Sequence, residues 1–137
     1  MSSPRRLAAI GGLGLVLLGG CGGDDDAGVR TFDDPRAGIE VEAGQEFRIE
    51  LRENPVTGYL WRFAARPAAA VVRYLGSDFR LEEGGEERAG AGGTRRLRFR
   101  AVAAGQTEMV LRNVFTGGER GRRPAAVRRI AVTVSDG

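Results

Sequence analysis

Short runs that alternate apolar and polar residues restrict what this sequence can fold into more than any other feature. Residues 47–52 read FRIELR, residues 97–100 read LRFR and residues 130–134 read IAVTV. A period of two places successive side chains on opposite faces of a β-strand. Similar alternation or short apolar runs of strand length occur at residues 38–43, 59–63, 71–79 and 108–112.

These runs predict an all-β domain at residues 29–137, built as an immunoglobulin-like antiparallel β-sandwich of about six to eight strands. Beyond residue 20, no stretch keeps a helical period for about ten residues without Gly or Pro. Parallel sheets are not expected, because parallel strands need long crossover connections and the sequence offers no crossover helix. A domain of this length can bury an adequate core without disulfides.

The first 20 residues have the pattern of an export signal. Arg5 and Arg6 precede an uncharged, mostly apolar stretch at residues 7–18, which is shorter than the roughly 20 residues of a membrane-spanning helix. The stretch ends in LGGC, which resembles the bacterial lipobox, and its Cys21 is the only cysteine in the chain. The alternative is an ordinary signal peptide with a chance cysteine. We expect residues 1–20 to be removed and lipidated Cys21 to anchor the exported protein to the bacterial cell envelope.

Residues 21–28 are expected to form a flexible tether that is rich in Gly and acidic residues. The run from Asp24 to Asp26 could be read as a cation site, but no further ligands are spaced for one, so a solvated charge run is the better interpretation. Removing the signal lowers the formal net charge from +3 to +1, because Arg5 and Arg6 are lost. Nucleic-acid binding, which depends on a basic excess, is therefore not expected.

The chain contains no His and a single Cys. Ser-His-Asp and Cys-His nucleophile pairs, His metal ligands and Cys-rich zinc sites are therefore excluded. The carboxylate pairs at residues 82–83 and 86–87 lie in a Gly-rich segment that cannot hold catalytic geometry. We predict a monomeric binding protein that is not an enzyme and that has no cofactor and no metal.

Three segments between the expected strands have unusual compositions. Residues 53–59 (ENPVTGY) combine Pro55, whose φ is fixed, with Gly58, which is free to adopt a positive φ. Residues 81–94 (LEEGGEERAGAGGT) are rich in Gly, and residues 116–124 (TGGERGRRP) carry three Arg. Taken singly, each segment can be a plain connection, a disordered surface loop or a solvated hairpin end.

Taken together, these segments resemble those of the chagasin-type inhibitors of papain-family cysteine peptidases, over about residues 29–135. Residues 54–61 (NPVTGYLW) resemble the N-P-T-T-G-Y-x-W loop and strand of that family, and residues 90–94 (GAGGT) resemble its G-x-G-G loop. Val56 stands where the family usually has its first Thr. Arg123-Pro124 resembles the start of the family's R-P-W motif, but Ala125 follows in place of the Trp.

The resemblance implies that three loops at one end of the sandwich form a wedge that enters the peptidase cleft. It implies a reversible inhibitor that performs no covalent chemistry and whose partner is a papain-family cysteine peptidase. Tyr59 is expected to support the base of the first loop, and Trp61 is expected to be the buried Trp of the core. The peptidase-binding residues would be Asn54, Pro55, Val56, Thr57, Gly58, Gly90, Ala91, Gly92, Gly93, Arg123 and Pro124.

A second function remains open at this point. The chain could be a non-inhibitory lipoprotein module, interacting or structural, with the same fold. Val56 and the missing Trp after Pro124 favour this alternative, because both changes remove side chains that the family is expected to present to its target.

Overall fold

The computed structural model describes residues 28–85, 90–118 and 123–137, and within them the chain forms eight strands and one 3-10 turn, η1 (Pro55–Thr57). This confirms the prediction of an all-β domain. The strands are β1 (Arg30–Asp33), β2 (Ile39–Glu42), β3 (Glu46–Glu53), β4 (Tyr59–Ala65), β5 (Val72–Leu81), β6 (Gly93–Ala101), β7 (Gly105–Phe115) and β8 (Ala126–Ser135).

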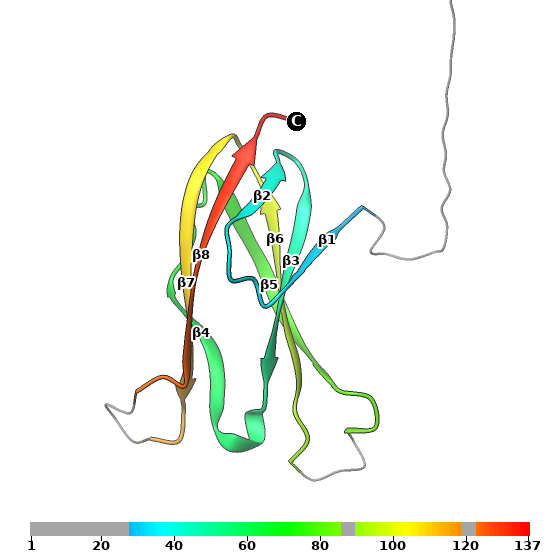
Figure 1. The fold of residues 1–137 in the computed structure, drawn as a ribbon, viewed down its shortest axis with the longest axis vertical. Helices are drawn as coiled ribbons and strands as arrows, with labels where there is room; N and C mark the ends of the chain where they lie inside the picture. The colour runs from blue at the N-terminus through cyan, green and yellow to red at the C-terminus, as the bar shows by residue number, and fades with distance from the viewer. Residues whose placement is uncertain (1–27, 86–89, 119–122) are drawn as a thin grey trace, which may run out of the picture.

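The strands form two four-stranded sheets that pack face to face (Figure 1). Sheet A has the order β1-β3-β6-β5, and sheet B has the order β2-β8-β7-β4. The long inner strands pair antiparallel: β3 with β6 in one sheet and β7 with β8 in the other. The predicted sandwich is therefore confirmed, with a strand number at the upper end of the expected range.

Neither sheet is a parallel sheet, as expected, but each contains one parallel pair at its edge, which the sequence did not indicate. β1 runs parallel to β3, and β2 runs parallel to β8. The physical reason is that β1 and β2 are edge strands on opposite sheets, joined by residues 34–38. The connection from β1 to its parallel partner β3 passes through the other sheet by way of β2, so strand β2 replaces the crossover helix.

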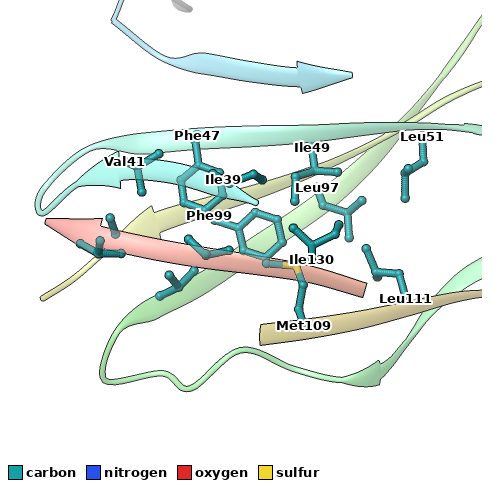
Figure 2. Close-up of a cluster of buried hydrophobic side chains, with 14 residues drawn as sticks. Ile39, Val41, Phe47, Ile49, Leu51, Leu97, Phe99, Met109, Leu111 and Ile130 are labelled. Atoms are coloured by element: carbon teal, nitrogen blue, oxygen red, sulfur yellow. The ribbon is translucent and has the colours of Figure 1, made fainter. Parts of the chain in front are cut away.

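The core fills the space between the two sheets (Figure 2). At its centre Phe47 and Phe99 stack, with ring centroids 5.2 Å apart. The alternating residues predicted to face inward do so, which follows from the period of two. The fully or nearly fully buried residues are Ile39, Val41, Phe47, Ile49, Leu51, Val72, Leu97, Phe99, Ala101, Met109, Leu111, Ile130, Val132 and Val134.

Trp61 differs from its predicted place. It is only partly buried and packs against the margin of the core cluster. Strand β4 forms the free edge of sheet B, so one side of its inward-facing side chains has no neighbouring strand to cover it.

The predicted signal peptide (residues 1–20), Cys21 and residues 22–27 of the tether lie outside the described residues. Their roles therefore stay predictions. Within the described ranges, no helix is long and apolar enough to cross a membrane.

Candidate functional site

The three unusual segments lie at the same end of the sandwich (Figure 1). The first is the loop at residues 54–58, which joins β3 to β4. The second joins β5 to β6 and is called here the glycine arm (residues 82–92, described except for 86–89). The third joins β7 to β8 at residues 116–125, of which 119–122 lie outside the described residues. The first loop lies between the other two and contacts both.

The first loop is a capped 3-10 turn. The backbone N–H of Val56 donates to Asn54 Oδ1 at 3.1 Å, which makes Asn54 the N-cap of η1. Pro55 follows at the first position of the turn, where a missing N–H costs nothing. Thr57 donates from its hydroxyl to the carbonyl oxygen of Asn54 at 2.7 Å. Gly58 ends the turn with a φ of 87°, a conformation that favours glycine.

Asn54 also joins the first loop to the glycine arm. Its side-chain Nδ2 donates to the carbonyl oxygen of Gly90 at 2.9 Å. An open groove of about 500 Å³ lies between the two loops, and the arm's Gly90, Ala91 and Gly92 form one wall of it. One amide side chain therefore caps the turn and fixes the position of the arm across the groove.

The other flank of the first loop is fixed by the third loop. The carbonyl oxygen of Gly58 accepts two hydrogen bonds from Thr116, one from the backbone N–H at 2.7 Å and one from the hydroxyl at 2.8 Å. The ring of Phe115 lies so close to Gly58 that an added Cβ would come within 2.8 Å of it. Tyr59 packs on the same ring, with centroids 5.3 Å apart, which places it at the base of the first loop.

Beneath the first loop lies a buried carboxylate. Glu53, which is 3% exposed, accepts hydrogen bonds from Arg95 Nε at 3.0 Å and from the backbone N–H of Trp61 at 2.8 Å. Arg95 Nη2 is also 2.8 Å from the same carboxylate. Because Glu53 and Arg95 belong to sheet A and Trp61 belongs to sheet B, the carboxylate joins the two sheets at the end that carries the loops. We call these three residues the Glu53 clamp.

A second polar network braces Trp61 from the side. Its indole Nε1 donates to the carbonyl oxygen of Arg52 at 2.7 Å, and the guanidinium of Arg128 lies over its ring at 5.5 Å. Arg128 is held in turn by Asp34, with Nε 2.6 Å from Oδ1 and Nη2 3.2 Å from Oδ2. The hydrogen bonds from Arg128 and then Arg36 lower the pKa of Asp34 from its ordinary 3.8 to about 2.

The tip of this end is apolar and suits contact with another surface. Within the described ranges, no group of three or more His, Cys, Asp or Glu side chains is placed to hold a metal ion. The turn at its tip carries no charged side chain. Val56 projects from it with 70% of its surface exposed, so the end presents an apolar tip on a backbone that is hydrogen-bonded on both flanks.

The comparisons with known proteins agree with this geometry. A model of the chagasin family of peptidase inhibitors, I42, matches residues 40–134, which is most of the described domain. The chain belongs to the chagasin family. Members of this family are inhibitors of peptidases and not enzymes, which confirms the prediction drawn from the missing His and Cys residues.

Solved structures with this fold include inhibitors of cysteine proteases. The inhibitor EhICP2 from Entamoeba histolytica is similar with a TM-score of 0.62 and 17% identity, covering 77% of this chain and 94% of that chain. PbICP-C, whose structure was determined in complex with falcipain-2, is similar with a TM-score of 0.51 and 15% identity, covering 77% and 88%. No curated protein matches the sequence.

The chagasin-family loop residues predicted from the sequence do not all lie at the surface. Gly90 is exposed, but Gly92 and Gly93 are buried, and Gly93 is the first residue of β6, paired with both Glu53 and Leu81. A Cβ at Gly93 would overlap the carbonyl oxygen of Arg80. Gly93 is therefore needed for close packing of the strands. The residues that the arm presents at the surface are Gly90 and Ala91.

The remaining predicted residues lie where the third loop returns to the sheet. Arg123 is exposed and Pro124 is half-buried, just before β8. Ala125 donates its backbone N–H to the carbonyl oxygen of Asn113 at 2.8 Å, which closes the base of this loop. Arg123 and Pro124 thus lie at the same end of the sandwich as the first loop. The hydrogen bonds from the third loop to the first loop come from Thr116.

Sequence reasoning missed the Glu53 clamp, although its signal was present. The inward-facing series Phe47, Ile49 and Leu51 continues at Glu53, and Leu97 is preceded at the same spacing by Arg95. Opposite charges at inward positions on two expected neighbouring strands indicate a buried ion pair, because an unpaired charge there would be too costly.

Proposed function

We propose that the protein is a lipid-anchored, reversible inhibitor of papain-like cysteine peptidases, and that it acts by inserting the loop end of the sandwich into the active-site cleft. Family membership supports the inhibitory class of function. The relative PbICP-C forms a complex with falcipain-2, a precedent for binding of such a sandwich to a peptidase.

The observation that carries the proposal is the fixation of the first loop on both flanks. Asn54 bonds to Gly90 on one side, and Gly58 bonds to Thr116 on the other. A loop that is already ordered loses little conformational entropy when it docks. The 3-10 turn also keeps the backbone bent, so it does not offer a peptidase the extended segment needed for cleavage.

The contact itself would be made by the apolar tip and by exposed backbone. Val56 would fill the centre of the cleft, and burial of an exposed Val side chain favours binding by about 1.5–3 kcal/mol. Gly90 and Ala91 would lie along one wall of the cleft, and the third loop with Arg123 and Pro124 would lie along the other.

The anchor is the second part of the proposal. The motif at Leu18 to Cys21 supports lipidation of Cys21 and retention of the exported protein at the cell envelope. Intact mass of the protein extracted from membranes tests this directly. A mature form that starts at another residue, or that lacks acyl mass, would refute the anchor without affecting inhibition.

Inhibition of papain by the purified domain, residues 28–137, tests the first part. This part of the chain contains every residue of the buried core, which runs from Ile39 to Val134. We expect full, reversible inhibition at micromolar concentration or below. A folded domain that leaves papain fully active at that concentration would end the proposal.

Two exposed valines give a matched pair of variants for locating the contact. Val56 lies at the loop end, and Val102, which is 39% exposed, lies in the turn between β6 and β7 at the opposite end. We expect Val56→Asp to weaken papain inhibition at least tenfold, roughly 1.4 kcal/mol, and Val102→Asp to leave it unchanged. Equal effects of the two changes would contradict the cleft-binding model.

The non-inhibitory module remains the second candidate, because Val56 has no hydroxyl and Ala125 follows Pro124. Val56→Thr separates the two candidates. A gain in papain affinity from a barely inhibiting domain would show that the docking mode is retained but weakened. No gain, in a folded domain that does not inhibit, would favour the module.

A further inference from the structure

The two sheets carry different charge on the faces that point away from the core. By strand register, the outward face of sheet A holds seven Arg and four carboxylates, whereas that of sheet B holds three of each. The charged residues on sheet A are Arg48, Arg52, Arg73, Arg80, Arg96, Arg98, Arg100, Asp33, Glu46, Glu50 and Asp78. Among the outward-facing strand residues, the basic excess therefore lies on sheet A, and this side is called here the basic face.

Only part of this charge is neutralised within the described residues. Arg96 pairs with Glu50, with Nε 3.4 Å from the carboxylate, and Arg100 pairs with Glu46. No described carboxylate forms an ion pair with the exposed side chain of Arg98. The residue opposite it on β3 is another arginine, Arg48.

The strand register places like charges opposite one another. Arg73 of β5 faces Arg100 of β6, and Arg98 of β6 faces Arg48 of β3. Like charges directly opposite each other on neighbouring strands destabilise a sheet. Arg100 is already paired with Glu46, and Arg73 and Arg98 form no ion pair with a described carboxylate, so these two side chains are the ones that an external anionic surface would neutralise.

We propose that the basic face lies against the anionic phospholipid headgroups of a bilayer. The charges are spread over three neighbouring strands rather than gathered around a pocket, which fits a plane of many headgroups better than a single anion. Basic residues near such a surface add electrostatic attraction that decays within a Debye length.

The path of the chain supports this occupant. The domain begins at β1, which is the edge strand of the same sheet, and Arg30 pairs with Phe47 at the end of β3 remote from the loops. Six residues lie between Cys21 and Gly28, and the seven steps along the chain reach about 25 Å when extended. This step rests on the proposed lipid anchor, which would hold the basic face close to the bilayer and leave the loop end exposed at the side.

Sedimentation of the domain of residues 28–137 with lipid vesicles tests the inference independently of the anchor. We expect binding to vesicles of mixed phosphatidylglycerol and phosphatidylcholine, little binding to phosphatidylcholine alone, and release by high salt. The double variant R73Q/R98Q should reduce binding roughly tenfold or more. Its matched control, R112Q/R129Q, removes the same charge from the outward face of sheet B and should have little effect.

Three outcomes would overturn the inference. These are equal losses from the two double variants, binding that does not depend on phosphatidylglycerol, and tighter basic-face binding to a polyglutamate chain than to the vesicles. Papain inhibition is measured on the same samples, because the substituted residues lie outside the three loops. A domain that inhibits papain but does not bind the vesicles would refute the membrane-binding proposal alone. A domain that binds the vesicles but does not inhibit papain would refute the proposed inhibitory function alone.

Discussion

The Glu53 clamp offers the sharpest test of how the loop end is held together. In Glu53→Gln the side chain keeps its size but has one acceptor oxygen and one donor NH2 in place of two acceptors. The carboxylate accepts from Arg95 through one oxygen and from the N–H of Trp61 through the other. Whichever way the amide is turned, it therefore points an NH2 group at one of these donors.

The size of the effect follows from burial and from charge. A hydrogen bond to a charged group contributes about 1.5–3 kcal/mol, and a buried donor that loses its partner costs a further 1–3 kcal/mol or so. Arg95 is 24% exposed, so water can compensate part of the loss. We expect Glu53→Gln to lower the free energy of unfolding by about 2–3 kcal/mol, measured by urea denaturation.

The control is Glu46→Gln, which removes the same charge from the exposed pair with Arg100 on the basic face. Exposed ion pairs contribute below about 1 kcal/mol, so this variant should be near wild type in stability. Glu53→Gln should also weaken papain inhibition, assayed where both variants are fully folded, and Glu46→Gln should not. If the two variants have equal stability and equal inhibition, the buried carboxylate does not organise the loop end.

The remaining predictions concern the loop and its distant brace. Asn54→Ala should cost about 1–2 kcal/mol of stability and weaken papain inhibition, because it removes both the cap and the link to the arm; unchanged inhibition would contradict this. Gly58→Ala should lower the free energy of unfolding by at least about 1 kcal/mol, because of its positive φ and the nearby Phe115 ring. In a Phe115→Ala background, measured by denaturation curves, the same change should cost less, because the clash with the ring is gone and only the cost of the positive φ is left. The lowered pKa of Asp34 means that its ionised form stabilises the fold above pH 3.8, and that this stability is lost as the pH falls towards about 2. Since the side chain is one-third exposed, the contribution is about 1 kcal/mol, and urea titrations of Asp34→Asn should lack this acid-dependent step.

The sequence was sufficient to predict the sandwich because its strands are half-buried and regular. Phe47, Ile49 and Leu51 mark one inward face, and Ile130 with Val132 mark another. A period of two translates directly into which side of a strand is buried, with no knowledge of its partner. The turn at residues 54–58 could also be predicted, because Pro fixes φ and Gly permits a positive φ through local sterics alone.

Features that depend on distant residues could not be predicted in this way. The parallel placement of β1 and β2 depends on which sheet each short edge strand joins, and nothing in their four-residue sequences determines it. The bond between Asp34 and Arg128 joins residues 94 positions apart. Composition places Gly93 in the Gly-rich segment between two strands, whereas in the structure it begins β6 and lies close to the carbonyl oxygen of Arg80.

The Glu53 clamp also explains how the loop end keeps a single shape where the apolar core ends. Leu51 is the last fully buried apolar residue of β3 before the loop, and the next inward position is Glu53. Apolar contacts are not directional and would let the two sheets slide slightly against each other. Hydrogen bonds from Arg95 and from the backbone of Trp61 have fixed directions and lengths, so they hold β3, β4 and β6 in one relative position. Since the first loop joins β3 to β4 and the glycine arm leads into β6, the carboxylate that closes the sandwich also sets the spacing of the two loops that would enter a peptidase cleft.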